Sequence, residues 1–292
     1  MKKMFLLLFG LLSLTLSGCK EISKQPDIIT SLYPQYSIAK SILGDSELHL
    51  SLIIPVGADG HHFTPTSRDI MHIENAKLFL YTSESMEPWV KNLKGNKVDL
   101  SVGLDAHEHE HAHEHEHDHV HYFVSIENQM HMTHIILDEI KKIDPDNAAT
   151  YEANAAALLN GFEDVLNKFI LLGEKKIYYI GHNVFDTFTH ETHIGVHSLL
   201  SSFTDEANPT SQDLMDLINE VKTNNINILY YDALTMKDLA ATIKDDLSDD
   251  DYDVIIRPLH SFHNVLLKDF HTTKSLVDLW LENYEVIKLA YE

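Results

Sequence analysis

Histidine side chains, interleaved with carboxylates, are the residues of this sequence with the clearest capacity for chemistry. The chain has 292 residues, including 21 histidines, 45 aspartates and glutamates, and one cysteine. Eight histidines occupy every second position from His107 to His121. Imidazoles and carboxylates are ligands for Zn, Cu and Ni, and this repeat predicts loose metal capture, because a flexible segment has no preformed geometry. The residues assigned to this auxiliary role are His107, His109, His111, His113, His115, His117 and His119.

A specific site requires histidines on ordered loops. His61, His182 and His260 each follow a short apolar run that is predicted to be a strand. His121 ends the His-rich segment and precedes a predicted helix. Loops after the strands of open α/β sheets form the ligand-binding edge. We therefore expect these four histidines, two from each half of the chain, to converge in one cleft.

The elements that position these histidines are short apolar runs that alternate with longer amphipathic runs. This alternation predicts two α/β lobes with mainly parallel sheets. Asp144 and Pro145 are typical of a helix start and Gly173 of a helix end, so one helix of about 40 Å is expected to join the lobes. The predicted strands are residues 28–32, 48–54, 78–82, 176–180, 227–231 and 252–257, and the predicted helices include 34–43, 68–76, 212–223, 235–247 and 272–290.

The N-terminus is predicted to be a lipoprotein signal peptide. Lys2 and Lys3 precede an apolar run, and the segment Leu16-Ser17-Gly18-Cys19 resembles a bacterial lipobox in which Cys19 receives the lipid. Such a protein is anchored to a membrane and works outside the cytoplasm, at the cell surface or in the periplasm. The expected organisation is a signal peptide (1–18), a tether (19–26), an N-terminal α/β lobe (27–143, with a His-rich loop at 105–120), a linking helix (144–173) and a C-terminal α/β lobe (174–292).

Charge and cysteine content exclude several classes of protein. The formal net charge of −23 argues against nucleic acid as a partner, because binding to phosphates requires clustered Lys and Arg. One cysteine permits neither an intramolecular disulfide nor a Cys-based zinc cluster. Any metal site must therefore be built from histidines and carboxylates.

Five segments of the chain resemble a known family. They are Pro55–Thr66, His121–Asn128, Gly181–Phe185, Asn208–Leu214 and Arg257–His260. These segments are similar to sequences of the cluster A-I substrate-binding lipoproteins of ABC importers, the ZnuA/TroA-like zinc and manganese binders. The resemblance implies two lobes bridged by one helix, with a metal site in the cleft between them. It also implies that the metal ligands are His61, His121 and His182, with His260 at the position of a family glutamate.

The function implied by the resemblance is capture of Zn(II) and its delivery to an ABC importer, a permease with a cytoplasmic ATPase. Gly60 and Ile126 replace family prolines, and Arg257 replaces an Asn or Asp beside the fourth ligand position. His263 or Asp269 is therefore an alternative to His260 as that ligand. Four imidazoles suit a tetrahedral Zn²⁺, whereas manganese or iron members of this class are richer in oxygen ligands, and copper or nickel also binds imidazole.

A zinc-dependent extracytoplasmic hydrolase is the alternative from a different class. The segment His190-Glu191-Thr192-His193 lacks the two-residue gap of the H-E-x-x-H motif. Four histidine ligands also close the tetrahedron, whereas a catalytic zinc keeps an open position. We therefore expect a binding protein rather than an enzyme, with His193 and His197 as surface residues. A metal-storage or adhesion protein is a third alternative, because it would use the same His-rich loop. A transport assay distinguishes such a protein from one that delivers metal to an importer.

Overall fold

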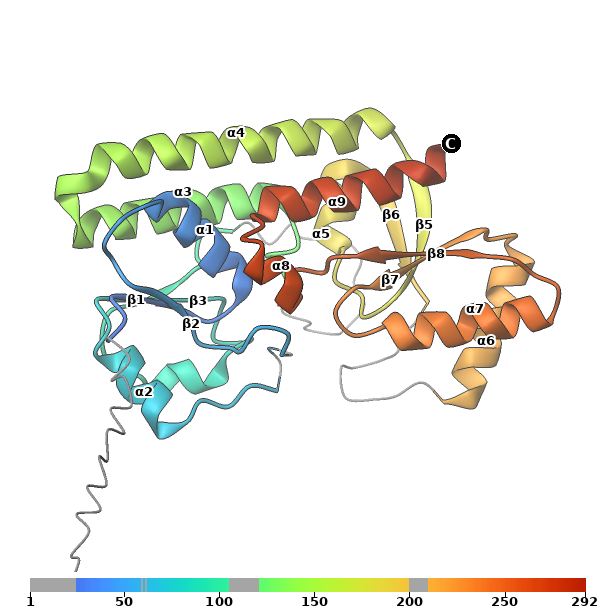
Figure 1. Cartoon of the computed structure of the whole chain (residues 1–292), viewed down its shortest axis with the longest axis horizontal. Coiled ribbons are helices and arrows are strands. Elements are labelled where there is room, and N and C mark those ends of the chain that lie inside the picture. The colour runs from blue at the N-terminus through green and yellow to red at the C-terminus, as the bar shows by residue number, and fades with distance from the viewer. Residues whose placement is uncertain (1–24, 59, 61, 105–120, 200–209) are drawn as a thin grey trace, which may run out of the picture.

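Two α/β lobes lie side by side beneath a long helix in the computed structural model of the chain (Figure 1). The structure describes residues 25–58, 60, 62–104, 121–199 and 210–292. Each lobe is built on a four-stranded sheet in which every paired strand is parallel to its neighbour. The predicted α/β class with mainly parallel sheets is therefore confirmed.

The sheet of the N-lobe has the order β2-β1-β3-β4. Its two central strands are apolar and buried on both faces, as helix-covered parallel strands require. Helix α1 contributes to the core on one face, and α2 contributes to a smaller cluster on the other. The elements are β1 (Ile28–Thr30), α1 (Tyr33–Leu43), β2 (Leu50–Leu52), α2 (Ser67–Glu74), β3 (Leu78–Tyr81), the 3-10 helix η1 (Pro88–Asn92), β4 (Lys97–Asp99) and α3 (Ile126–Ile143).

The sheet of the C-lobe has the order β6-β5-β7-β8. Its elements are β5 (Lys175–Ile180), α5 (Asp186–Thr192), β6 (Ile194–Ser198), α6 (Ser211–Thr223), β7 (Ile228–Asp232), α7 (Lys237–Asp249), β8 (Ile255–Leu259), α8 (Leu267–His271), α9 (Leu276–Lys288) and the 3-10 helix η3 (Leu289–Tyr291). Strand β8 is at the sheet edge, where Pro258 does not interrupt an inner ladder.

The connection between the lobes differs in detail from the predicted single helix. A 3-10 turn, η2 (Pro145–Asn147), comes first, and helix α4 (Ala148–Leu172) follows and ends at Gly173, whose φ of 79° favours glycine. Figure 1 shows α4 extending over both lobes with α9 beside it. Helix α9 contacts both α4 and α1, so two helices rather than one cross the junction. None of the helices in the described ranges combines the length and apolarity that crossing a membrane requires.

Several short elements were not predicted from the sequence, namely β4, α5, β6 and α8. Strand β6 contains Gly195 and His197, which weaken its apolar pattern, and α5 spans only seven residues. The predicted strand 252–257 begins later, after Asp251, which has a φ of 56°. The predicted helix 272–290 is also shorter, because Ser275 caps α9 through a reciprocal hydrogen-bonded pair with Asp278.

Trp280 of α9 is the packing centre between the lobes. Its side chain is fully buried and lies against Phe188 of α5 and Phe262, with ring centroids 5.3 and 4.2 Å away. Phe169 of α4 packs edge-on at 6.0 Å. The indole Nε1 donates a 2.9 Å hydrogen bond to Oε1 of Gln129 on α3, in the N-lobe. One side chain therefore joins elements of both lobes.

Truncating this indole should destabilise the whole molecule. Trp280→Ala is expected to lower the free energy of unfolding by about 3–5 kcal/mol, because it leaves a cavity and removes the partner of the buried Gln129 amide. Leu171→Ala is the matched control, since Leu171 is 85% exposed, and it should change stability by no more than about 0.5 kcal/mol. Urea unfolding of the metal-free protein measures both; equal effects would contradict this packing role.

Candidate metal centre

Three histidines meet at the junction of the lobes. The ring centroid of His121 lies 4.8 Å from that of His182 and 4.7 Å from that of His263, and both pairs are edge-to-face. His121 lies in the turn that leads into α3 of the N-lobe, whereas His182 and His263 follow β5 and β8 of the C-lobe. The two C-lobe residues therefore lie at the carboxyl edge of their sheet, where the loops of parallel sheets bind ligands.

The position of His182 depends on the glycine before it. A Cβ atom at Gly181 would lie 2.5 Å from the ring of Tyr179, and this ring is buried and donates a 3.0 Å hydrogen bond from Oη to Asp232. The ring cannot move away without breaking that bond, so only glycine allows the chain to turn here.

His263 is positioned by a left-handed residue. Phe262 has a φ of 63°, which is rare for a bulky side chain, and its ring is completely buried against Trp280. This turn brings His263, which is 9% exposed, to within 5.4 Å of the ring of Phe123. Packing of Phe262 in the interlobe core therefore offsets the backbone strain that places His263 beside His121.

The segment around His121 is held by polar contacts inside the N-lobe. The backbone carbonyl of His121 accepts a 2.9 Å hydrogen bond from the amide of Val124. Tyr122 donates from Oη to the carbonyl of Thr82 at 2.8 Å, and Asn128 donates to the carbonyl of Tyr122 at 2.9 Å. The turn that carries His121 is therefore fixed to both β3 and α3.

His260 and Asp269, two of the three alternatives for the fourth ligand, are bonded to other groups. The Nε2 atom of His260 lies 3.0 Å from Oε2 of Glu282 on α9. Asp269 forms a 2.7 Å ion pair with Lys274. The structure thus places His263 beside His121, and it places His260 against α9.

His61 lies outside the described residues, as do Cys19 and the auxiliary histidines from 107 to 119. Within the described ranges, no three His, Cys, Asp or Glu side chains are arranged closely enough to hold a metal ion. His121, His182 and His263 are near neighbours but do not form a complete coordination shell, which requires Zn–N distances of about 2.0–2.1 Å.

The other histidines that sequence reasoning weighed are separated from this group. His193 ends α5 in the left-handed conformation, and His197 lies on β6 with Nε2 2.8 Å from Glu220. These two residues do not share a helix, so their i, i+4 spacing creates no common face. The expected surface location of His197 agrees with its 38% exposed side chain.

Glu191, considered as a hydrolase carboxylate, instead caps helix α3. Its carboxylate accepts hydrogen bonds from Oγ of Ser125 at 2.9 Å and from the backbone amides of Ile126 and Glu127 at 2.8 and 3.0 Å. These amides are unpaired donors at a helix N-terminus, where negative charge is favourable. Burial nevertheless raises the pKa of Glu191 to about 7, against the lowering by the three hydrogen bonds.

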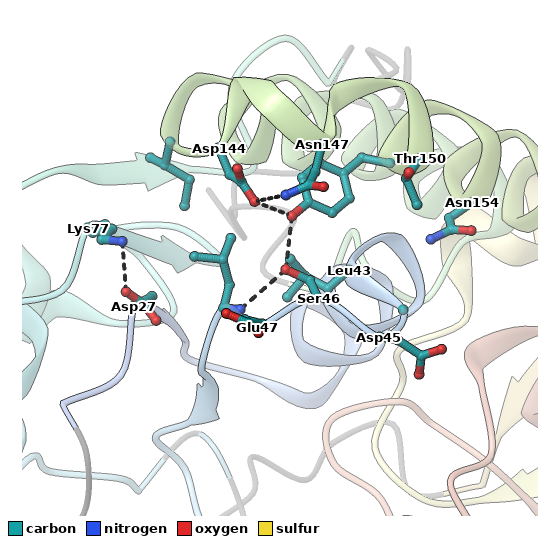
Figure 2. A pocket seen from close by; sticks show the side chains of 14 residues that line it. Asp27, Leu43, Asp45, Ser46, Glu47, Lys77, Asp144, Asn147, Thr150 and Asn154 are labelled. Carbon is teal, nitrogen blue, oxygen red and sulfur yellow. Dashed lines mark hydrogen bonds and ion pairs between the residues drawn. The ribbon is translucent and has the colours of Figure 1, made fainter.

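A separate polar hollow of about 800 Å³ lies in the N-lobe, lined in part by residues that precede β1 and β3 (Figure 2). Asp27 pairs with Lys77 at 2.9 Å. Asp144 accepts a 2.5 Å hydrogen bond from Tyr151, whose Oη is also 2.9 Å from Oγ of Ser46. The Asp27–Lys77 ion pair and the hydrogen bonds of Asp144 join these groups to one another, and none of the predicted metal ligands lines the hollow.

The two parallel α/β lobes, joined by a long helix and contributing histidines to one junction, define a two-lobe solute-binding protein. The chain belongs to the ZnuA family, described as zinc-uptake complex component A, periplasmic, whose family profile matches residues 28–287. This confirms the predicted resemblance, and the family description agrees with the expected extracytoplasmic location.

Curated relatives are about a quarter identical to the chain over the residues that align. The zinc-binding lipoprotein AdcA of Streptococcus pneumoniae strain R6 is 27% identical over 267 residues, covering 83% of this chain and 53% of AdcA. The high-affinity zinc uptake system protein ZnuA of Bacillus subtilis is 27% identical over 241 residues, covering 75% of each chain. The chain thus spans about half the length of the AdcA relatives.

Solved structures show the same fold. The Zn(II)-bound ZnuA-like domain of AdcA from Streptococcus pneumoniae aligns with a TM-score of 0.73 at 20% identity, over 91% of this chain and 98% of that one. The metal-dependent lipoprotein YcdH of Bacillus subtilis aligns with a TM-score of 0.73 at 22% identity, over 89% and 97%.

The raised pKa of Glu191 predicts pH-dependent stability of the metal-free protein. The ordinary pKa is 4.5 and the folded value is about 7, so the folded state binds this proton more tightly. The resulting stabilisation is complete below the unfolded pKa and is lost as pH rises through the folded pKa, by on the order of 2–3 kcal/mol. The glutamine of the Glu191→Gln variant does not titrate. The free energy of unfolding of the wild type should therefore fall relative to that of this variant between about pH 5 and 8.

Urea unfolding of both proteins across that pH range measures the effect. Glu220→Gln in the same lobe is the control, because the Glu220 carboxylate is 35% exposed and pairs with His197. A stability difference between wild type and Glu191→Gln that stays constant with pH would contradict the assignment.

Proposed function

We propose that this protein captures Zn(II) outside the cytoplasm and delivers it to an ABC importer, a permease with a cytoplasmic ATPase. The observation that supports this most directly is the group formed by His121, His182 and His263, whose imidazoles come from both lobes. Membership of the ZnuA family and the zinc-binding names of its relatives support the same cargo. Zinc is thus the transported substrate and not a resident cofactor.

The proposed ligands are His61, His121, His182 and His263. His263 replaces His260 in this set, because His263 is the one that lies beside His121 while His260 is bonded to Glu282. Oδ1 of Asp269 pairs with Lys274 at 2.7 Å, whereas its buried Oδ2 has no hydrogen-bond partner among the described residues. The ion pair therefore makes this carboxylate, the group that a manganese or iron site would favour, a weaker ligand without occupying both of its oxygens. An all-imidazole shell favours Zn²⁺ in tetrahedral coordination.

The same four ligands favour a metal-binding protein over a metal-dependent enzyme. Four imidazoles leave no coordination position for a water or a reacting substrate. Glu191, the carboxylate closest in sequence to the histidines of a hydrolase-like segment, has its oxygens engaged by the N-terminus of α3. A general base must be free to accept a proton from the reacting group, so this carboxylate is not arranged as one.

The His-rich segment is proposed to be an auxiliary collector. Its histidines alternate with acids, which gives many overlapping ligand pairs without a fixed geometry. Together with the net charge of −23, the segment raises the local concentration of cations near the protein. The tight site is expected to remain when this segment is removed.

Single substitutions distinguish the ligands, in a variant that lacks residues 108–119. His263→Ala should weaken zinc binding on the order of 100-fold, because three ligands plus water remain. His260→Ala and Asp269→Asn should bind within about threefold of the parent, since both side chains are bonded elsewhere. Competition with a zinc chelator measures the three affinities. A larger loss in His260→Ala than in His263→Ala would restore His260 as the ligand, and a loss confined to Asp269→Asn would favour manganese.

Attachment to the membrane through Cys19 is the remaining part of the proposal. Cys19 is the sole cysteine and follows Leu16-Ser17-Gly18, with two lysines and an apolar run before it. A diacylglyceryl thioether together with an N-terminal acyl chain provides more than one lipid chain, which is sufficient for stable anchoring.

Replacing this cysteine should release the protein from the membrane. Cells that express wild type should incorporate labelled fatty acid into the protein, and cells that express Cys19→Ala should not, because no thiol remains to accept the lipid. Fractionation should place wild type with the membrane. Cys19→Ser is a second variant that preserves side-chain size; equal labelling of wild type and both variants would refute the anchor.

A further inference from the structure

The boundary between the lobes contains a carboxylate that reaches across it. Glu191 belongs to α5 of the C-lobe, yet its three hydrogen-bond donors, at 2.8 to 3.0 Å, are Ser125, Ile126 and Glu127 at the start of α3 in the N-lobe. Ser125 is four residues after His121, and α5 begins four residues after His182. This carboxylate thus connects the segment that carries one proposed ligand to the helix that follows another.

A second side chain crosses the boundary at a separate place. Asn264 directly follows His263 and is 5% exposed. Its Nδ2 donates to the backbone carbonyls of Pro55 and Ala58 at 2.8 and 2.7 Å, and its Oδ1 accepts from the amide of Val265 at 2.8 Å. The amide group therefore ties the loop after β8 to the turn after β2, three residues before His61.

Both contacts are chemically specific. The N-terminus of α3 requires acceptors, which the Glu191 carboxylate provides and a carboxamide nitrogen would not. The two carbonyls of the turn require donors, and a single amide NH₂ has two. Neither contact can be replaced by apolar packing, because buried backbone donors and acceptors would remain unpaired.

We propose that Glu191 and Asn264 are positioning residues for the zinc site, each holding one ligand-bearing segment of the N-lobe in register with the ligand loops of the C-lobe. The proposal rests on the proposed function. Metal sites tolerate displacements of only a few tenths of an ångström, so groups that orient the ligands control affinity without touching the metal. Helices α4 and α9 set the lobes beside each other, and these two contacts fix the loops at their facing edges.

Isosteric substitutions separate this role from general stability. Glu191→Gln places an amide nitrogen against the backbone donors, and Asn264→Asp places a carboxylate oxygen against the carbonyls of Pro55 and Ala58. The matched controls are Glu220→Gln and Asn224→Asp, whose side chains bond within the C-lobe. All four are made in the full chain and compared at about pH 8, where Glu191 is ionised.

Two readouts are required. Competition with a zinc chelator measures the zinc affinity. The affinity should be about 10-fold to 100-fold weaker in the boundary variants, Glu191→Gln and Asn264→Asp, and within about twofold of the wild-type value in each control. The visible absorption of the Co(II)-loaded protein reports ligand geometry, and it should lose tetrahedral intensity in the boundary variants only. A thermal-unfolding measurement on every variant confirms that it is folded at the temperature of the assay.

The outcomes are distinguishable. Boundary variants that bind zinc like wild type, or that weaken no more than the controls, overturn the positioning role while leaving the proposed function intact. A folded wild type with no tight zinc site would refute the proposed function itself. Should Asn264→Asp fail to fold, Asn264→Ser, which keeps one donor, must show an intermediate loss of affinity, and wild-type affinity in that variant would overturn the role of Asn264.

Discussion

The imidazoles of the candidate metal centre come from two separate lobes, so the distances between them are set by how the lobes pack. His121 is fixed to β3 and α3 of the N-lobe, and His182 and His263 are fixed to the ends of β5 and β8 of the C-lobe. No local element of either lobe determines the 4.7 and 4.8 Å separations of their rings. The interlobe contacts therefore set the geometry of the candidate site.

A buried apolar core stabilises the junction between the lobes. Trp280 is enclosed by aromatic rings from α4, α5 and the loop after β8, and it is hydrogen-bonded to Gln129 of the opposite lobe. Rings of this size bury large areas, and their edge-to-face and stacked contacts also fix orientation. The same core accepts Phe262 in a left-handed conformation, so packing energy offsets the backbone strain that points His263 at the site.

Polar contacts add the directionality that apolar packing lacks. Tyr33 of α1 donates from Oη to the carbonyl of Lys274 at 2.6 Å, next to the ion pair that engages Asp269. Glu191 and Asn264 supply acceptors and donors where loop backbone from the other lobe requires them. The placement of Lys274 has a chemical consequence, because a paired carboxylate is a poorer competitor for a metal. The all-nitrogen character of the proposed site therefore depends on residues beyond its ligands.

The sequence by itself determined the class of fold and the long helix, and it predicted three of the proposed ligands. These predictions depend on local signals that can be recognised without knowledge of distant contacts. The signals are the apolar runs of buried parallel strands and the helix boundaries at Asp144-Pro145 and Gly173. The motifs around His61, His121 and His182 are similarly local, and the ligand role of all three remains a prediction. Short elements such as α5 and β6 were not predicted. Helix α5 has only seven residues, and β6 contains Gly195 and His197, so neither segment shows a clear hydrophobic periodicity.

Only the tertiary structure distinguished His263 from His260. The sequence favoured His260, which stands at the position of a family glutamate, with His263 three residues later as an alternative. The structure places His263 beside His121 instead, and this placement depends on Phe262, whose positive φ is stabilised by a tryptophan on a distant helix. The hydrogen bonds of Glu191 and Asn264 across the lobes could not be predicted from the sequence for the same reason. Their partners are backbone atoms more than 60 residues away, which no residue type or spacing in the chain reveals. Contacts between side chains and remote backbone arise only when the lobes have packed.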